Sequence, residues 1–389
     1  MRTILITGPG GSGRTTVAAA TALHSARQGT RTLVLSADRT DTLGVALGVP
    51  TGASPVEVAP ALTAWRPDAA ARFREDLVAF QNRAAGALDL LGAAPLDAEE
   101  VTPLPGAEEL ALLRALRDTA LSDSYDLLVV DLPPVPKALA LLSLPEELRR
   151  YLRRLLPPER QAARALRPVL GRLAGVPMPA EWLYETAARW DLDLAAVEAV
   201  LADRATTAWV VAEPGPAGAD AVRTAVTGLA LRALRTETLV ANRVLPDDVH
   251  DTWFMALAAQ QRKALAEWQG VHDVHRTPHL GGDPRGADEL ARLTTPDVNP
   301  APSPVEWPVT GHSTGEGVLV WHIPLPGAIR EELDLVRRGD ELVVTAGPFR
   351  RIVPLPSALR RCTVAGASLR EGELRIRFTP DPQVWPRGL

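Results

Sequence analysis

The chain has 389 residues, enough for two domains or for one large domain with a small one. Its net charge of −5 argues against a nucleic-acid partner held by a broad basic surface. Cys362 is the only cysteine, which excludes an intrachain disulfide and any zinc or arsenite site built from several thiolates of one chain. No stretch reaches about 18 uninterrupted apolar residues, so we expect no membrane span and a cytoplasmic protein.

The first predicted elements open a parallel sheet covered by helices. A strand is predicted at 2–7 (RTILIT), then a glycine-rich turn, a helix over about 14–27 and a second apolar strand that ends at Asp38. Further short apolar runs are typical of buried parallel strands. They lie at 125–131, 207–213 and 236–242, with a weaker candidate at 270–276.

Two long segments are predicted to be helical, at about 54–120 and 146–203. In the second, which follows Pro145, apolar residues recur at three- and four-residue spacing and arginines occupy the other face. Such helices form either a subdomain packed on the sheet or a groove for an apolar client helix. The pattern alone leaves both interpretations open.

The C-terminal part has a different pattern. Residues 295–316 are rich in proline and lack periodicity, so they are predicted to be a linker. Beyond them, apolar runs at 317–326, 340–348, 350–356 and 372–380 alternate with turn residues. This is typical of a compact antiparallel β-domain.

The strongest local signal is the glycine-rich run that follows the first strand. Its glycines allow positive φ, and the following helix N-terminus offers amide donors and a favourable dipole to phosphate. In a P-loop, a lysine reaches the β- and γ-phosphates and a Ser or Thr hydroxyl binds Mg²⁺. Here Arg14 and Thr15 hold those two positions.

The same run also contains G-x-G-x-x-G, from Gly8 to Gly13, with Asp38 in place to bind a ribose as in dinucleotide enzymes. A glycine turn without a ligand is a third interpretation. The residues R-T-T after the last glycine suit phosphate and Mg²⁺ better than a nicotinamide cofactor. Neither of the two lysines, Lys137 and Lys263, follows a tyrosine by four residues, as a hydroxysteroid-type reductase would require.

The glycine-rich run resembles the deviant Walker motif of the ArsA-type ATPases. Three later segments resemble other motifs of this family, each at its expected place in the order. This family includes the arsenite-pump ATPase and the targeting factor for tail-anchored membrane proteins. Ser36-Ala37-Asp38 followed by Leu43 resembles its first switch, and residues 131–145 resemble its second switch without a gap. Residues 240–246 (VANRVLP) are similar to the family's V-x-N-x-V-L-P, and Pro278 and Gly286 fall in a later loop on the adenine side.

The resemblance implies an α/β fold of the P-loop NTPase type, with helices on both faces of a parallel sheet and an inserted helical subdomain. It also implies ATP and Mg²⁺ as ligands. The implied phosphate-binding residues are Gly10, Gly11, Ser12, Gly13, Arg14, Thr15 and Thr16.

The resemblance assigns further roles outside the phosphate loop. Thr15 and Asp131 would serve Mg²⁺, Asp38 would orient the attacking water beside Arg14, and Asn242 and Pro278 would lie on the adenine side. From the residues alone, the two aspartates could simply end strands, and the asparagine could be a turn residue.

The C-terminal segment carries an independent resemblance. It is similar to the α-crystallin (small-heat-shock) type β-sandwich found on some bacterial ArsA-like chains. The residues that carry it are Leu333-Asp334-Leu335, the run 339–344, Arg350-Arg351 and Leu355-Pro356. The predicted domains are therefore 1–294 for nucleotide binding, 295–316 as linker and 317–389 as β-domain.

The sequence departs from the family at the positions that carry the chemistry. The first lysine of the motif, which in the family reaches the nucleotide of the partner subunit, is Pro9, which offers no charge and no donor. The second lysine is Arg14, whose larger planar group cannot occupy a lysine site unchanged. In the switches, Pro-Ala-His has become 39–41 (RTD) and Gly-His has become 136–137 (PK), so Arg39 and Lys137 are candidate substitute cations.

Three hypotheses follow. The first is a weak ATPase or ATP-binding switch, a homodimer whose helical subdomains receive an apolar client such as a membrane-protein segment. The second is a pseudo-ATPase, a chaperone or scaffold without turnover. The third is an oxidoreductase that binds NAD(P) in a Rossmann fold.

Overall fold

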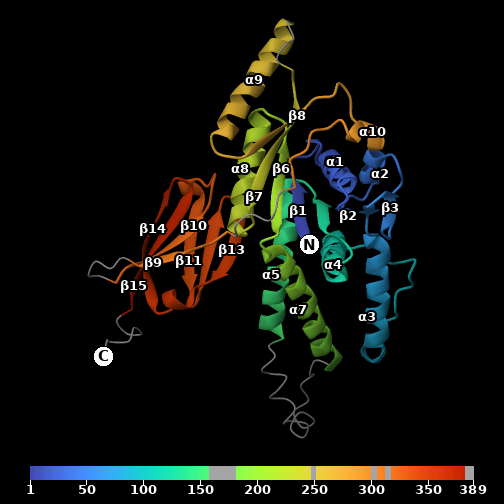
Figure 1. Ribbon diagram of the computed structural model, residues 1–389. Helices are drawn as coiled ribbons and strands as arrows, with labels where there is room; N and C mark the ends of the chain where they lie inside the picture. Colours follow the sequence, from blue (N-terminus) through green and yellow to red (C-terminus); the bar gives the residue numbers. More distant parts are fainter. Residues whose placement is uncertain (157–180, 247–250, 299–304, 312–316, 382–389) are drawn as a thin grey trace.

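The computed structural model describes residues 1–156, 181–246, 251–298, 305–311 and 317–381 (Figure 1). Within these ranges, eight strands form one sheet in the order β3-β4-β2-β5-β1-β6-β7-β8. All pair in parallel except β3, which runs antiparallel to β4 at one edge. The strands are β1 (Arg2–Thr7), β2 (Thr32–Ser36), β3 (Val56–Ala59), β4 (Leu62–Trp65), β5 (Leu127–Asp131), β6 (Thr206–Ala212), β7 (Thr236–Val244) and β8 (Val274–Pro278).

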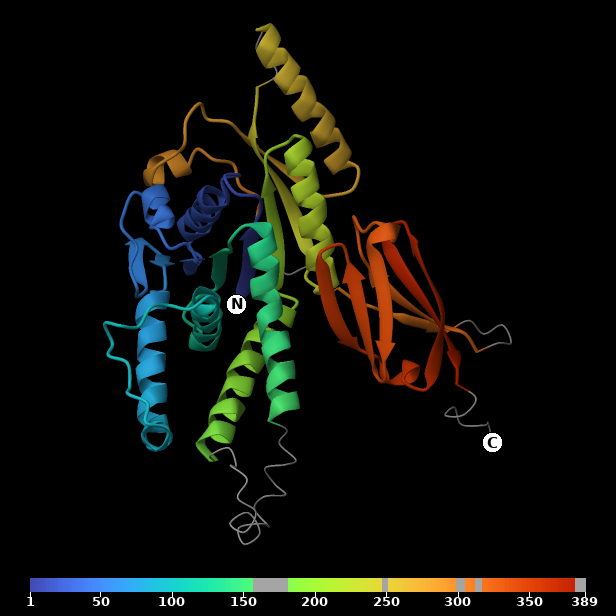
Figure 2. The ribbon, with the colours of Figure 1, turned by 180° about the vertical axis from the view of Figure 1, so that it is seen from behind.

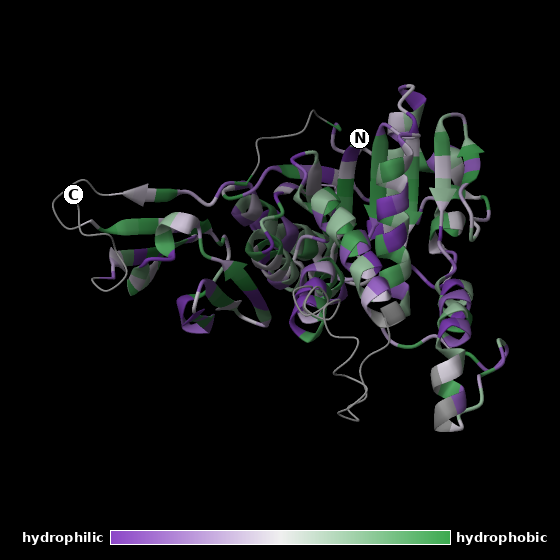
Figure 3. Ribbon diagram, turned by 90° about the horizontal axis from the view of Figure 1, so that it is seen from below, coloured by the Kyte–Doolittle hydropathy of each residue, from purple (hydrophilic) through white to green (hydrophobic). Residues whose placement is uncertain are grey.

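The central strands are apolar on both faces because helices cover both. Along β1, Leu5 belongs to one hydrophobic core, whereas Ile4 and Ile6 belong to the core on the opposite face. These strands are coloured as hydrophobic along most of their length (Figure 3). This is the pattern expected of a parallel sheet buried on both faces, and it explains why short unbroken apolar runs marked the strands.

Each face of the sheet has its own set of helices. One core is built with α1 (Arg14–Arg27), α2 (Thr42–Leu47) and α10 (Gly286–Leu290). The opposite core is built with α4 (Ala107–Ser122), α5 (Val135–Leu155), α7 (Glu181–Ala202), α8 (Pro216–Leu231) and α9 (Thr252–Gln269). Helix α3 (Ala69–Leu91) packs on α4. In Figure 1, α3, α5 and α7 extend beyond one end of the sheet, and α9 extends beyond the other.

The C-terminal part is a separate antiparallel β-structure with its own core. Its two sheets have the orders β14-β15-β10-β9 and β11-β12-β13. The strands are β9 (Val309–Gly311), β10 (Leu319–Pro324), β11 (Leu333–Arg338), β12 (Glu341–Ala346), β13 (Phe349–Pro354), β14 (Cys362–Arg370) and β15 (Glu373–Pro380). Trp321, Ile323, Val344 and Phe378 are buried between them. The predicted fold class, a helix-covered parallel sheet followed by a small antiparallel β-sandwich, is confirmed.

Several predicted elements differ in detail. The segment 54–120 was expected to be helical throughout, but it begins with β3 and β4, which extend the sheet beyond β2. The second helix was placed after Pro145, yet α5 begins at Val135 and continues through that proline, which is buried. Residues 309–311 of the predicted linker form β9, which pairs with β10. The helical pattern predicted over 157–180 lies outside the described residues.

None of the helices in the described ranges is long and apolar enough to span a membrane.

Candidate functional site

The glycine-rich run forms the turn between β1 and α1. Gly11 and Gly13 adopt φ of 80° and 85°, which side chains with a Cβ rarely tolerate. Gly13 is the N-cap of α1, and in the described structure no side chain caps it. The first turn of α1 therefore keeps the unpaired amide donors that make a helix N-terminus a site for anions. Ser12 adds a buried hydroxyl with no hydrogen-bond partner in the described part of the chain.

Two further strand ends meet beside this turn because β5 lies between β1 and β2. The register pairs Asp131 with Ile6 on one side and with Ser36 on the other. Thr15, in the first turn of α1, donates a 2.7 Å hydrogen bond to Asp131 Oδ2, and Ser36 Oγ lies 3.2 Å from the same oxygen. The fold therefore brings together a threonine and an aspartate that lie 116 residues apart.

Asp131 lies in an unusual environment for a carboxylate. It is 2 % exposed, and its Oδ1 atom is buried without a hydrogen-bond partner among the described residues. Burial raises the pKa of Asp131 to about 6, and the nearby Asp38 adds to the rise, whereas Thr15, Arg14 and Ser36 oppose it. An unpaired carboxylate oxygen beside a threonine hydroxyl is a donor set that suits a hard cation such as Mg²⁺.

Asp38 lies just beyond the end of β2, close to Asp131. It accepts a 2.7 Å hydrogen bond from Thr42 Oγ1, and its amide donates to Ser36 Oγ at 3.3 Å. Its side chain borders a cavity of about 350 Å³, which Arg39 and Arg66 also line. The structure thus brings Asp38, Thr15 and Asp131 together at the carboxyl ends of β2, β1 and β5.

Asn242 approaches the turn from the other side, in β7. It is buried, and its Nδ2 donates a 2.7 Å hydrogen bond to the carbonyl of Ser12. A Cβ on Gly13 would lie only 2.3 Å from the same nitrogen. Pro278 lines a small cavity of about 20 Å³ together with Gly13, Thr16 and Asn242. The asparagine therefore supports the turn directly, and the space beside it is far smaller than a typical ligand pocket.

Gly286 was also expected on the adenine side, and in the fold it lies beside the end of α2. Gly286 begins α10 and packs against Gly48 at the end of α2, where a Cβ on Gly48 would lie 2.9 Å from its Cα. It does not line the cavity beside Asn242. Helix α10 packs on α1 and α2, and the chain returns to the cavity at Leu293.

Comparison with known proteins gives the family. The model for "Anion-transporting ATPase" matches residues 1–295, and that for "HSP20-like domain found in ArsA" matches residues 316–378. The chain belongs to the ArsA ATPase family. Protein SCO2128 of Streptomyces coelicolor is 73 % identical over the full length of both chains. Protein Rv2184c of Mycobacterium tuberculosis is 33 % identical, covering 99 % of this chain and 97 % of its own.

A more distant relative has a more specific name. The "putative arsenical pump-driving ATPase 1" of Aquifex aeolicus is 25 % identical, covering 97 % of this chain and 99 % of its own. Nothing in these comparisons supports the oxidoreductase hypothesis. Topology argues against it as well, because the first two strands of a doubly wound dinucleotide fold are neighbours. Here β5 separates β1 from β2.

The residues that depart from the ArsA-type motifs occupy definite places. Arg14 does not point to open solvent, because its Nη1 donates to the carbonyl of Leu132, directly after Asp131. Pro9 contributes its carbonyl, which accepts from the amide of Ser12 at 3.4 Å. Arg39 is exposed and pairs with Glu108. Lys137 is exposed in the first turn of α5. Of these residues, Arg14 is held beside Asp131, whereas Arg39 and Lys137 are exposed.

Arg243 is a residue that the sequence analysis did not single out. It has φ of 55°, and its guanidinium contacts three separate segments. Nη1 donates to the carbonyl of Gly11 at 3.1 Å and to Glu213 at 2.6 Å, and Nη2 donates to Asp283 at 2.9 Å. It connects the glycine turn to the ends of β6 and β8. In the sequence, only its position directly after Asn242 could have indicated that it lies near the glycine turn.

Proposed function

We propose that this chain is a nucleotide-dependent switch of the ArsA family that binds ATP with Mg²⁺ at the turn of residues 8–16. The observation that carries the proposal is the uncapped N-terminus of α1 beside the hydrogen bond from Thr15 to the buried Asp131. The main-chain amides of the turn would hold the phosphates, and Thr15 and Asp131 would hold Mg²⁺. When bound, Mg²⁺ supplies charge neutralisation at the phosphate oxygens.

The other residues near the turn have roles that follow from their positions. Asp38, held by Thr42 and close to Asp131, would orient a water molecule for attack on the terminal phosphate. Asn242 and Arg243 keep the turn in its conformation through the carbonyls of Ser12 and Gly11. Because main-chain donors do much of the binding, nucleotide affinity depends less on the missing lysines than turnover does.

Turnover is expected to be weak, and this favours a second candidate, a scaffold that binds nucleotide without hydrolysing it. Loss of a positioned cation costs on the order of 10³-fold or more in phosphoryl transfer. Arg14 is directed at Leu132, and Arg39 is paired with Glu108. For either arginine to serve as the missing cation, it would have to leave its present partner, whereas Lys137 is exposed.

Calorimetry tests binding. We expect heat of binding from ATP and ADP but not from NADP(H), with affinity that increases when Mg²⁺ is present. Thr15→Ala should remove the effect of Mg²⁺, whereas Thr363→Ala, on an exposed position of β14, should leave it unchanged. Absence of heat with ATP and Mg²⁺ in the wild type would exclude the proposal.

A phosphate-release assay separates the two candidates. A weak ATPase should lose its activity in Asp38→Asn but retain it in Asp97→Asn, an exposed aspartate far along the chain. If the wild type and Asp38→Asn release phosphate at the same background rate, the chain is a scaffold. A gain of hydrolysis in the double variant Pro9→Lys with Arg14→Lys would show that only these groups are absent.

The switch would act on two subunits and on an apolar client. Helices α5 and α7 extend beyond the sheet (Figure 1). They expose apolar side chains that a client helix could cover. These include Tyr151, Leu155, Trp190 and Leu192. Light scattering after gel filtration, with and without ATP and Mg²⁺, tests the dimer. A fluorescent peptide with the composition of a membrane span tests the client, and a polar peptide of equal length is its control.

A further inference from the structure

The C-terminal β-domain is packed directly against the end of α8 (Figure 2). Leu231, the last residue of α8, is completely buried within the hydrophobic core of the β-domain. Phe349, at the start of β13, packs against that core and also against the core of the ATPase domain. A Cβ on Gly228 would lie 2.3 Å from Leu139 of α5 and 3.1 Å from Phe349. The two domains therefore share close apolar packing.

A group of charged side chains joins α5 and α8 to the β-domain beside this packing. Glu146, in α5, pairs with Arg351 of β13 at 3.2 Å and with Arg232 at the end of α8 at 3.6 Å. Arg150, one turn further along α5, pairs with Glu341 of β12 at 2.9 Å. The side chains of Arg232 and Arg351 are only 11 % and 19 % exposed, so solvent screens these pairs less than it screens surface pairs. We call these five residues the Glu146 cluster.

Two hydrogen bonds to main-chain carbonyls reinforce the cluster, with one arginine donor from each domain. Arg351 Nη1 donates to the carbonyl of Leu231 at 3.0 Å, and Arg232 Nη2 donates to the carbonyl of Arg350 at 3.2 Å. Each arginine thus pairs with Glu146 and also contacts the main chain of the opposite domain. Moving the β-domain relative to α5 would break several contacts at once.

The other end of α5 contacts the candidate nucleotide site. The helix begins four residues after Asp131, and the amide of Val135 donates to the carbonyl of Gly8 at 3.2 Å. Arg14 holds the carbonyl of Leu132 in the short segment between them. Any shift of Asp131 or of the glycine turn is therefore transmitted to the first turn of α5.

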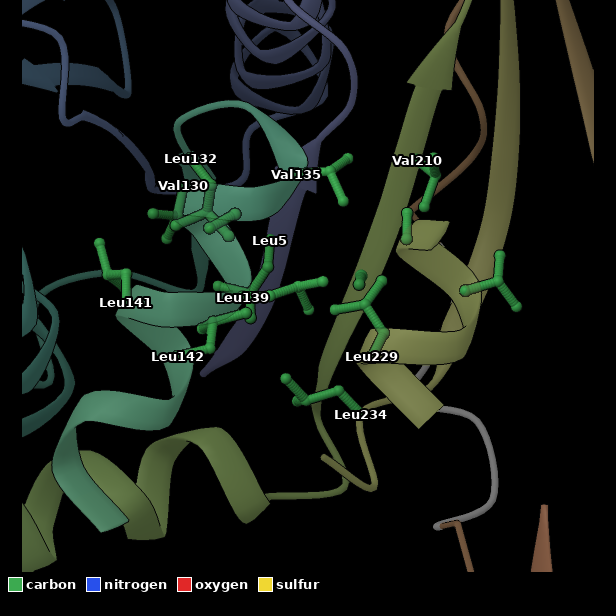
Figure 4. Close-up of a cluster of buried hydrophobic side chains, with 14 of the residues drawn as sticks. Leu5, Val130, Leu132, Val135, Leu139, Leu141, Leu142, Val210, Leu229 and Leu234 are labelled. Atoms are coloured by element: carbon green, nitrogen blue, oxygen red, sulfur yellow. The ribbon is translucent and has the colours of Figure 1, made fainter. Parts of the chain in front are cut away.

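The helix between these two ends is well supported. At 1.5 Å per residue, Glu146 lies about 16 Å along the axis from Val135. Val135, Leu139 and Leu142 are buried in the same core as Leu5 of β1 (Figure 4). A closely packed interior transmits a displacement because it has little free volume to absorb it.

We propose that α5 couples the nucleotide site to the β-domain, so that binding of nucleotide with Mg²⁺ beside Asp131 changes the docking of the β-domain at the Glu146 cluster. The inference rests on the proposed nucleotide binding and adds a role for the β-domain. Its docking would respond to the position of α5 and would also restrain it. Linkage requires the reverse effect as well, because weakening the docking must change the affinity for nucleotide by the same factor.

The first experiment measures the dissociation constant of a slowly hydrolysed ATP analogue with Mg²⁺ in the full-length chain. Arg351→Ala removes the docking contacts and should change this constant by about fivefold or more. Arg351→Lys should change the dissociation constant less than Arg351→Ala does, because lysine keeps a positive charge near Glu146. Arg361→Ala, an exposed arginine of the same domain, is the matched control and should not differ from the wild type. Glu341→Gln weakens the cluster from another side if Arg351→Ala does not fold.

The second experiment measures hydrogen exchange of the wild type with and without the analogue. Exchange in residues 349–354 should change on binding, whereas exchange in 373–380, in the other sheet of the β-domain, should not. If the analogue binds but neither the exchange in 349–354 nor the affinity of Arg351→Ala changes, the coupling is refuted while nucleotide binding stands.

The coupling can also be measured without any ligand. Asp131→Asn alters the packing at the start of the transmission path, so exchange in 349–354 should differ from that of the wild type, and Asp97→Asn should cause no difference. If the wild type binds no nucleotide, the proposed function fails, and this comparison still decides whether α5 connects the two regions. An unchanged exchange pattern in Asp131→Asn would overturn the connection itself.

Discussion

At the scale of single residues, Asp131 lies in an environment that opposes the stability of the fold. A buried carboxylate with an unpaired oxygen destabilises the folded chain, and nothing in the packing of β5 requires an acid there. The neighbouring Arg14 offsets only part of this effect, because Asp38 acts in the opposite direction. This unfavourable burial fits the proposed cation site, whose donors would be held in place before the cation binds.

The variant Asp131→Asn should therefore be more stable than the wild type at high pH. Because burial raises the pKa of Asp131 to about 6, both states are protonated below about pH 4 and the acid has no destabilising effect there. As pH rises from 4 through 6, the folded wild type loses up to about 3 kcal/mol. The melting temperature of Asp131→Asn should exceed that of the wild type at pH 8 and approach it at pH 4. An equal difference at both pH values would show that the charge is not responsible.

A second residue-scale prediction concerns two glycines of the same turn. Gly13→Ala combines positive φ with a clash against Asn242, and we expect a loss of about 1–2 kcal/mol in the free energy of unfolding. Gly10→Ala meets no atom within 4 Å and should be nearly neutral. Urea unfolding of both variants measures the contrast. Equal midpoints would mean that the turn is free to rearrange.

At the scale of elements, the sequence pattern predicted most central strands correctly but missed β3 and misplaced the start of α5. The unbroken apolar runs identified β1, β2, β5, β6 and β7, because strands buried on both faces have few polar residues. β3 was missed because its first residues are exposed and its short sequence lacks that signal. α5 was started too late because a proline normally ends a helix, yet here the buried Pro145 is held by the packing of the surrounding helix.

Arg149 of α5 forms ion pairs with two carboxylates of α7. Arg149 is 16 % exposed and pairs with Asp191 at 3.0 Å and with Glu198. Arg149→Ala removes the ion pair to Glu198 and leaves Asp191 with the more exposed Arg153, at 3.3 Å. We expect a loss of about 1–2 kcal/mol, reduced from the fully buried case by partial solvent access. Arg72→Ala, which removes an exposed i,i+3 pair, is the control. If the two variants unfold at the same denaturant concentration, the α5–α7 contact does not rest on Arg149.

At the scale of the whole molecule, the two domains are expected to unfold together. Because Leu231 of α8 completes the core of the β-domain, a cavity at this position affects both parts. Leu231→Ala should lose about 2–5 kcal/mol and lower a single cooperative transition. Leu192→Ala, at a position that is 70 % exposed, should change little. Two separate transitions in differential scanning calorimetry of the wild type would contradict this prediction.

The sequence alone was sufficient to place the main strands along the chain, the glycine turn and the residues that the ArsA-type motifs mark, whereas the order of the strands in the sheet came from the structure. These are local features, since strand period, glycine torsion and motif spacing are written in neighbouring residues. Only the tertiary structure decided that Asp131 has an unpaired oxygen, that Arg14 is directed at Leu132 and that Arg243 connects three segments. It also decided that the β-domain is docked on α5 and α8. These facts arise from contacts between residues far apart in the chain, whose geometry no local pattern specifies.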